Sequence, residues 1–197
     1  MVASWLSLAR YFPWPRRNIY TEPIQTLEDC SRELRSVRYT LEEMRRKGQR
    51  ISNLVDHNAL AKHARLRTHL FHTRHGPQAM KLCLHEFMKA RRKGAKMLTK
   101  RALENFKYEC ASYAGFVAVI LRGFGPDGRE SDAPSARLFD VGRMLLSLQC
   151  SAELLSNSKA PSKRELTGII RLLDLLQSVL EQYAGLVNLL EQGDYRI

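Results

Sequence analysis

The fold class follows most directly from residues 162–191, which read SKRELTGIIRLLDLLQSVLEQYAGLVNLLE. Ser162 and Glu165 have the spacing of a capping box, in which the serine oxygen and the glutamate carboxylate satisfy backbone N–H groups at a helix start. Leucine, isoleucine and valine then recur at helical spacing, and no proline interrupts them. This stretch predicts a long helix over about 163–191 that lies either in the centre of a bundle or at an interface between subunits.

Helical patterns also precede this stretch. Apolar residues from Leu27 to Met44 alternate at spacings of three and four, which predicts a helix packed against another helix. Gly76-Pro77 predicts a break, because glycine often ends a helix and proline often begins one. The sequence therefore predicts two long antiparallel helices over about 22–75 and 77–121, and a shorter helix over about 135–156.

The glycines inside the predicted long helices are not expected to end them. Gly48 weakens the apolar pattern and predicts a kink, while the apolar stripe around Gly94 continues on both sides, so the helix is expected to run through it. The chain is thus expected to be all-α, an elongated helical bundle without internal repeats. Its expected segments are an N-terminal arm over 1–20, a basic helical hairpin over 21–122, a loop over 123–134 and an apolar helical pair over 135–192.

Length and composition exclude several classes of protein. A chain of 197 residues with 44% hydrophobic residues is long enough to bury a core, so full disorder is not expected. No apolar run approaches the ~18 residues that span a bilayer. The four cysteines are widely spaced among apolar residues, which predicts buried thiols in a reducing, intracellular compartment.

The positive charge is concentrated in one part of the chain. Residues 57–107 hold 13 basic and 2 acidic side chains, a net charge of +11 out of +12 for the whole chain. Residues 108–197 hold 9 basic and 11 acidic side chains. The excess charge is therefore a local feature, and it predicts a binding surface for an anionic partner.

Most of these basic residues share one face if residues 77–121 form one straight helix. At 100° per residue, seven of the nine basic residues between positions 81 and 107 lie within about 120° of one another, and Arg91 and Arg101 lie outside. A solvated face usually mixes charges of both signs, so this ridge favours contact with phosphates, although counterions or acids on other helices could also neutralise it. The predicted anion-binding residues are Lys81, Lys89, Arg92, Lys93, Lys96, Lys100 and Lys107.

The N-terminal 20 residues contain three arginines and no acid. Three interpretations remain open: a mitochondrial presequence, an amphipathic segment that inserts into a membrane interface, and an arm that packs its tryptophans on the bundle. The first predicts a mitochondrial location and the second a cytoplasmic, membrane-peripheral one. The residues expected to act in targeting or insertion are Trp5, Leu8, Arg10, Phe12, Trp14, Arg16 and Arg17.

No motif predicts catalysis or a cofactor. Five histidines lie between residues 57 and 75, but no cysteine or carboxylate clusters with them as a zinc site would require, so no metal site is expected. Residues 123–128 match G-x-G-x-x-G, yet no helix is expected to begin there, which leaves a turn-rich loop. The sequence therefore predicts a protein that is not an enzyme.

The stretch from Arg74-His75-Gly76 to Met97-Leu98 resembles subunits of the ESCRT-III family. Those proteins carry a basic residue and glycine at a hairpin tip and then a helix rich in lysine and arginine. The C-terminal part departs from the family, because it is apolar rather than strongly acidic, and no tail motif for the disassembly ATPase is visible. The resemblance covers about half of the chain, and it implies a scaffold that assembles on membranes.

Two functions are expected from these observations. The first is a helical structural protein that docks through its basic face on RNA in a ribonucleoprotein, for example an organellar ribosome. The alternative is a membrane-surface or self-assembling scaffold, of ESCRT-III-like or viral matrix type, that binds acidic lipid through the N-terminal arm and the same basic face. Other protein subunits, or further copies of this chain, are expected to pack on the apolar C-terminal helices.

Overall fold

The computed structural model describes residues 19–49, 57–73, 75–123 and 139–193, without the side chains of 57–59, 71–73 and 193. These residues form a bundle of helices, so the all-α prediction is confirmed. The predicted N-terminal targeting residues and most of the predicted loop over 123–134 lie outside the described residues. The helices are α2 (Thr21–Arg46), α3 (His57–Thr73), α4 (His75–Arg92), α5 (Lys96–Gly123), α6 (Val141–Ser156) and α7 (Lys163–Gly193).

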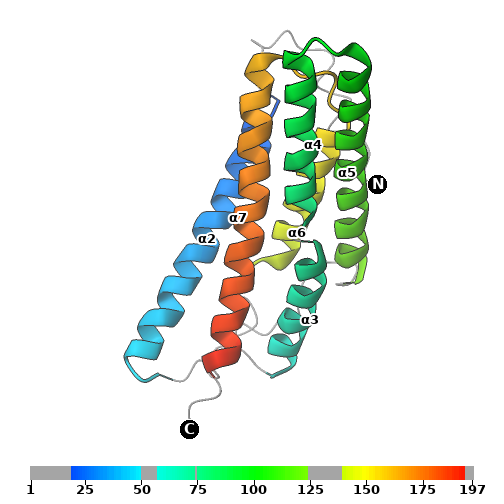
Figure 1. Cartoon of the computed structure of the whole chain (residues 1–197). Coiled ribbons are helices and arrows are strands. Elements are labelled where there is room, and N and C mark those ends of the chain that lie inside the picture. Colours follow the sequence, from blue (N-terminus) through cyan, green and yellow to red (C-terminus); the bar gives the residue numbers. More distant parts are fainter. Residues whose placement is uncertain (1–18, 50–56, 74, 124–138, 194–197) are drawn as a thin grey trace, which may run out of the picture.

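The bundle is elongated, and the helices run up and down its long axis (Figure 1). In that view α2 and α7 descend side by side, α3 and α4 ascend one above the other, α5 descends and α6 ascends. Polar contacts along α7 agree with this course, because Arg67 of α3 pairs with Glu191, while Arg91 of α4 reaches Pro161 just before α7. The helix α7 thus lies between α2 on one side and the α3–α4 pair on the other.

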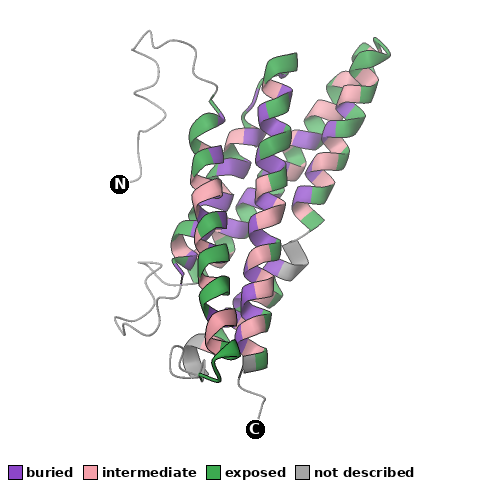
Figure 2. Ribbon diagram, turned by 90° about the vertical axis from the view of Figure 1, so that its left-hand side faces the viewer, coloured by how far each residue is buried: buried purple, intermediate pink, exposed green. Residues whose placement is uncertain are grey.

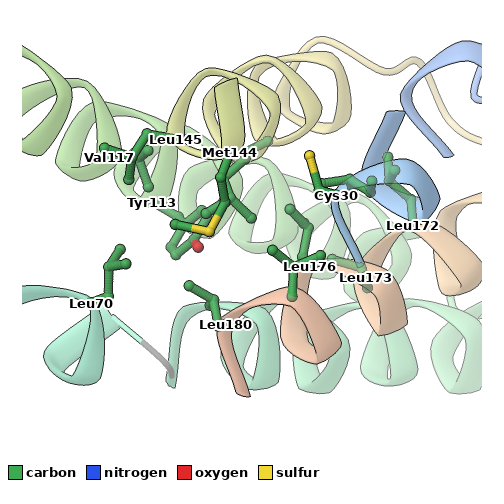
Figure 3. Packing of buried hydrophobic residues seen from close by; sticks show 14 of the residues in the cluster. Cys30, Leu70, Tyr113, Val117, Met144, Leu145, Leu172, Leu173, Leu176 and Leu180 are labelled. Atoms are coloured by element: carbon green, nitrogen blue, oxygen red, sulfur yellow. The ribbon is translucent and has the colours of Figure 1, made fainter. Parts of the chain in front are cut away.

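The apolar residues predicted to make the last helix central are buried. Leu172, Leu173 and Leu176 are fully buried among residues from the other helices, and burial forms stripes along the inner sides of all the helices (Figure 2). Figure 3 shows Cys30 of α2, Met144 of α6 and Leu176 of α7 directed into the same space. Of the two positions expected for this helix, the buried residues show packing within the bundle. A protein partner on the C-terminal helices stays a prediction.

The capping box predicted at the start of α7 is present. The backbone N–H of Ser162 donates to Oε2 of Glu165 at 2.7 Å, and the backbone N–H of Glu165 donates to Oγ of Ser162 at 3.3 Å. These bonds satisfy two backbone donors that a helix start leaves without partners. The sequence therefore located the beginning of this helix correctly.

The prediction that each long helix continues past its glycine is wrong, because α2 ends at Arg46, before Gly48, and α4 ends at Arg92, before Gly94. Gly48 and Gly94 both have φ +67°, a conformation that ends a helix and that side chains with a Cβ rarely adopt. At each end the N–H groups of the glycine and of the next residue bond to carbonyls in the last turn, Gly94 to Arg91 at 3.1 Å and Ala95 to Ala90 at 3.2 Å. The expected kink is a helix end, and the expected continuous helix over 77–121 is the hairpin of α4 and α5.

The reversal predicted at Gly76-Pro77 is also in the wrong place. A new helix does begin nearby, at His75, but α3 and α4 run in the same direction (Figure 1). Gly76 has a packing role instead, because a Cβ built on it would lie 2.3 Å from Cδ2 of Tyr113 in α5. The glycine thus lets α4 approach the buried ring of Tyr113 closely.

The cysteines are less uniformly buried than predicted. Cys30 and Cys110 are buried, Cys83 is half-buried and Cys150 is exposed, and all four thiols are free. Burial raises the pKa of each thiol, and raises it most for Cys110.

Within the described part of the chain, no helix combines the length and the apolar character that would carry it across a membrane.

Candidate functional site

The end of α4 at Gly94 gathers most of the predicted anion-binding residues at one end of the bundle. Residues 89–101 contain seven basic side chains and no acidic one, and they surround the turn that joins α4 to α5. We call this set the basic tip, and all of its side chains are exposed. Its members are Lys89, Arg91, Arg92, Lys93, Lys96, Lys100 and Arg101.

The predicted single ridge is therefore corrected, because the helix that would align it does not exist. Five of the seven predicted residues belong to the basic tip, together with Arg91 and Arg101, which the helical projection had set apart. Lys81 does not belong to it: its Nζ lies 2.7 Å from Oδ1 of Asp174 and 2.7 Å from Oε1 of Gln177, so it joins α4 to α7. Lys107 is half-buried and lies more than a helical turn beyond Lys100 on α5.

The positive charge of the basic tip is not neutralised by nearby acids. In the described segments none of its seven side chains forms an ion pair with an acid. The sequence Arg-Arg-Lys-Gly also ends α2, but there Arg46 pairs with Glu43 at 2.7 Å.

A second basic segment, in the connection between α6 and α7, lies beside the basic tip. Nη1 of Arg91 donates to the backbone oxygen of Pro161 at 2.6 Å, which joins the end of α4 to this connection. Lys159, Lys163 and Arg164 flank Pro161 and are exposed. Sequence reasoning missed these three residues, because they belong to a part of the chain with a slightly negative net charge and only a contact over 70 positions reveals their neighbours.

Acidic side chains at this end are few and partly engaged. Glu165 lies in the first turn of α7, where hydrogen bonds from the side chain and backbone of Ser162 lower the pKa of its carboxyl. Glu22 lies in the first turn of α2, which begins at the same end of the bundle (Figure 1). Glu86 on α4 and Glu104 on α5 each lie one helical turn outside the basic tip, and Glu153 lies near the end of α6. The seven cations of the basic tip and the three of the α6–α7 connection outnumber these acids.

Two large apolar side chains lie within the basic tip. Met97 is 81% exposed and Leu98 is 60% exposed, and both belong to the first turn of α5 between Lys96 and Lys100. Single exposed apolar residues are common on protein surfaces. An adjacent pair surrounded by cations is the arrangement by which peripheral proteins insert into the headgroup region of an acidic membrane.

The histidine-rich region does not assemble a metal site from the described residues. His63 is buried, and its Nδ1 lies 2.8 Å from the hydroxyl oxygen of Tyr183. Nδ1 of His75 lies 3.3 Å from Oε1 of Gln78, and His69 is exposed. The side chains of His57 and His72 lie outside the described residues. No group of three metal-ligating side chains occurs in the residues that the structure describes.

A groove of about 660 Å³ lies where the α3–α4 junction meets α7. Its polar side chains bond mainly to one another: Arg67 contacts Asn188 and Glu191, and Gln177 donates to Glu181 at 2.8 Å. The groove thus holds no set of polar groups that converge on a ligand.

Comparisons with protein families, with curated proteins and with solved structures find no match to this chain.

Proposed function

We propose that this chain is a non-enzymatic helical protein that docks on RNA through the basic end of its bundle. The observation that supports the proposal is the basic tip: seven exposed cations around one turn, with no acid between residues 89 and 101. Keeping such charges together is unfavourable unless an anionic partner neutralises them. A phosphate backbone supplies many negative charges in one molecule and gains entropy by releasing its counterions.

The chemistry of the tip favours contacts to phosphates over contacts to bases. Lysine outnumbers arginine among its members, and an ammonium group acts as a point charge rather than as a planar fork for two acceptors. The exposed aromatic residues of α5, Tyr108 and Phe116, lie beyond the tip along the helix, so they offer bases no platform beside Lys96 or Lys100. The proposed contact therefore depends on the charge and shape of the RNA.

The experiment is a titration of a structured RNA at salt concentrations from about 50 to 200 mM. For a variant with K89Q, R92Q, K96Q and K100Q, we expect the slope of log affinity against log salt to fall by about 3, since each lost phosphate contact contributes about 0.7 to 0.9. The matched control carries R45Q, R46Q, K47Q and R122Q, which removes the same charge from exposed sites at the other end of the bundle. Binding by the wild type that does not depend on salt would refute the proposal.

Acidic membrane is the second candidate partner, and the exposed pair Met97–Leu98 favours it. In this alternative the two apolar side chains enter the headgroup region while the surrounding lysines meet acidic lipid, and the N-terminal arm adds a second anchor. The variant M97S/L98S separates the candidates, because it keeps every charge. If lipid is the partner, this variant loses cosedimentation with vesicles of phosphatidylserine and phosphatidylcholine; if RNA is the partner, its RNA affinity equals that of the wild type.

A further inference from the structure

The basic tip and the α6–α7 connection are held together as one surface. Nη1 of Arg91 donates to the backbone oxygen of Pro161 at 2.6 Å, and Pro161 itself is buried. Ser158 is buried as well, and its hydroxyl donates to the backbone oxygen of Leu155 at 2.8 Å. The connection is therefore fixed at both of its ends, by Ser158 after α6 and by the capping box before α7.

This placement gives the basic end two separate segments of exposed cations. Lys159, Lys163 and Arg164 in the connection form no ion pair within the described residues. Glu165 is the only acidic residue in the connection and the first turn of α7, and its carboxylate accepts a hydrogen bond from the backbone N–H of Ser162. A partner that fits both segments must therefore carry negative charge over a broad surface, rather than along one narrow line.

The side chains described at this end also disfavour one mode of RNA binding. Proteins that hold single strands usually stack the bases on exposed aromatic rings. The large aromatic side chains that are exposed in the described residues, Tyr39, Tyr108 and Phe116, lie along α2 and α5 and not in either basic segment. A duplex in the A form is instead bound by its shape, through phosphates and 2′-hydroxyl groups on two strands.

We propose that the basic tip and the cations Lys159, Lys163 and Arg164 together bind the backbone of double-stranded RNA, in preference to single-stranded RNA. This inference rests on the proposed function and makes it more specific. The two strands of a duplex present two rows of phosphates, and the two basic segments offer cations to both rows. Lys159, Lys163 and Arg164 then act as further anion-binding residues.

The test is fluorescence anisotropy with a short RNA duplex and with its separated strands, each titrated at several salt concentrations. The variant K159Q/K163Q/R164Q changes only exposed residues, and R45Q/R46Q/K47Q is its matched control, because it removes the same charge from the other Arg-Arg-Lys-Gly helix end. For the first variant we expect the salt slope on the duplex to fall by about 2.7, at about 0.9 for each lost phosphate contact. For the control we expect the slope of the wild type.

The possible results separate this inference from the function on which it rests. An unchanged slope for K159Q/K163Q/R164Q, with binding still weakened by K89Q/R92Q/K96Q/K100Q, would overturn the shared surface and keep the proposed function. Equal affinity of the wild type for the duplex and for the single strands would overturn the preference for a duplex. Absence of salt-dependent binding of either RNA by the wild type would overturn both proposals. Thermal unfolding of each variant shows that a lost contact, and not a lost fold, is measured.

Discussion

Gly76 at the start of α4 lies directly against the ring of Tyr113 in α5, and a Cβ at Gly76 would lie 2.3 Å from Cδ2 and 2.9 Å from Cε2 of that ring. The ring is buried in a closely packed interior, so a methyl group at Gly76 fits only if the ring or one of the two helices shifts.

Gly76→Ala is expected to lower the free energy of unfolding by about 1 to 3 kcal/mol, the usual effect of overpacking a core. Gly115→Ala is the matched control, because Gly115 is exposed in the middle of α5 and an added Cβ would meet nothing within 4 Å. Removing a glycine from a helix interior should raise stability by up to about 1 kcal/mol. Urea denaturation measures the free energy of unfolding of both variants. Equal stability of Gly76→Ala and the wild type would show that the contact is not as close as described.

Gly94→Ala is expected to destabilise the protein by about 1 to 2 kcal/mol, because alanine is strained at φ +67° although nothing lies within 4 Å of its Cβ. Gly94→Asn should cost less, since asparagine tolerates this conformation better. Gly48 has the same φ at the other end of the bundle and serves as the comparison. Both alanine variants should lose stability in urea denaturation, but only the one at position 94 should also weaken RNA binding, because only that turn shapes the basic tip.

The buried His63 predicts a dependence of stability on pH. Burial lowers the pKa of His63 in the folded chain below the value of about 6.5 that it has when unfolded. Just below pH 6.5 the unfolded chain therefore binds the proton more readily, so stability is lost as the pH falls through this window and levels off below the folded pKa. Denaturation at a series of pH values should show a smaller loss for His63→Gln than for the wild type. Equal losses in the two proteins would contradict the burial of this imidazole.

Local signals in the sequence predicted the parts of this fold that local chemistry controls. The capping box of Ser162 and Glu165 gave the start of α7, and its apolar residues indicated the interior position that they occupy. Gly48 and Gly94 were misjudged, because an apolar pattern continues past each of them. The missed signal was the repeated Arg-Arg-Lys-Gly, since basic residues followed by glycine are typical of a helix end.

The composition of the candidate site could be predicted only in part, because part of it depends on contacts between distant positions. The excess charge of residues 57–107 was evident from the sequence and led to five members of the basic tip. The helical projection also put Lys81 on this surface, although in the folded chain it contacts Asp174 and Gln177. No local pattern in the sequence shows that these two residues lie beside it. For the same reason the contact of Arg91 with Pro161, which adds a second basic segment, had no counterpart in the sequence pattern.

The measurement that tests the central claim most directly is the rate at which each lysine is acetylated in the wild-type protein, with and without bound RNA, read by mass spectrometry. The account predicts that RNA slows the modification of the exposed lysines at the basic end, while Lys47 and Lys62 at the opposite end react at the same rate in both samples. The protected residues should be Lys89, Lys93, Lys96, Lys100, Lys159 and Lys163. Equal protection of Lys47 and Lys62, or protection that leaves Lys96 and Lys100 unchanged, would show that the anionic partner binds elsewhere.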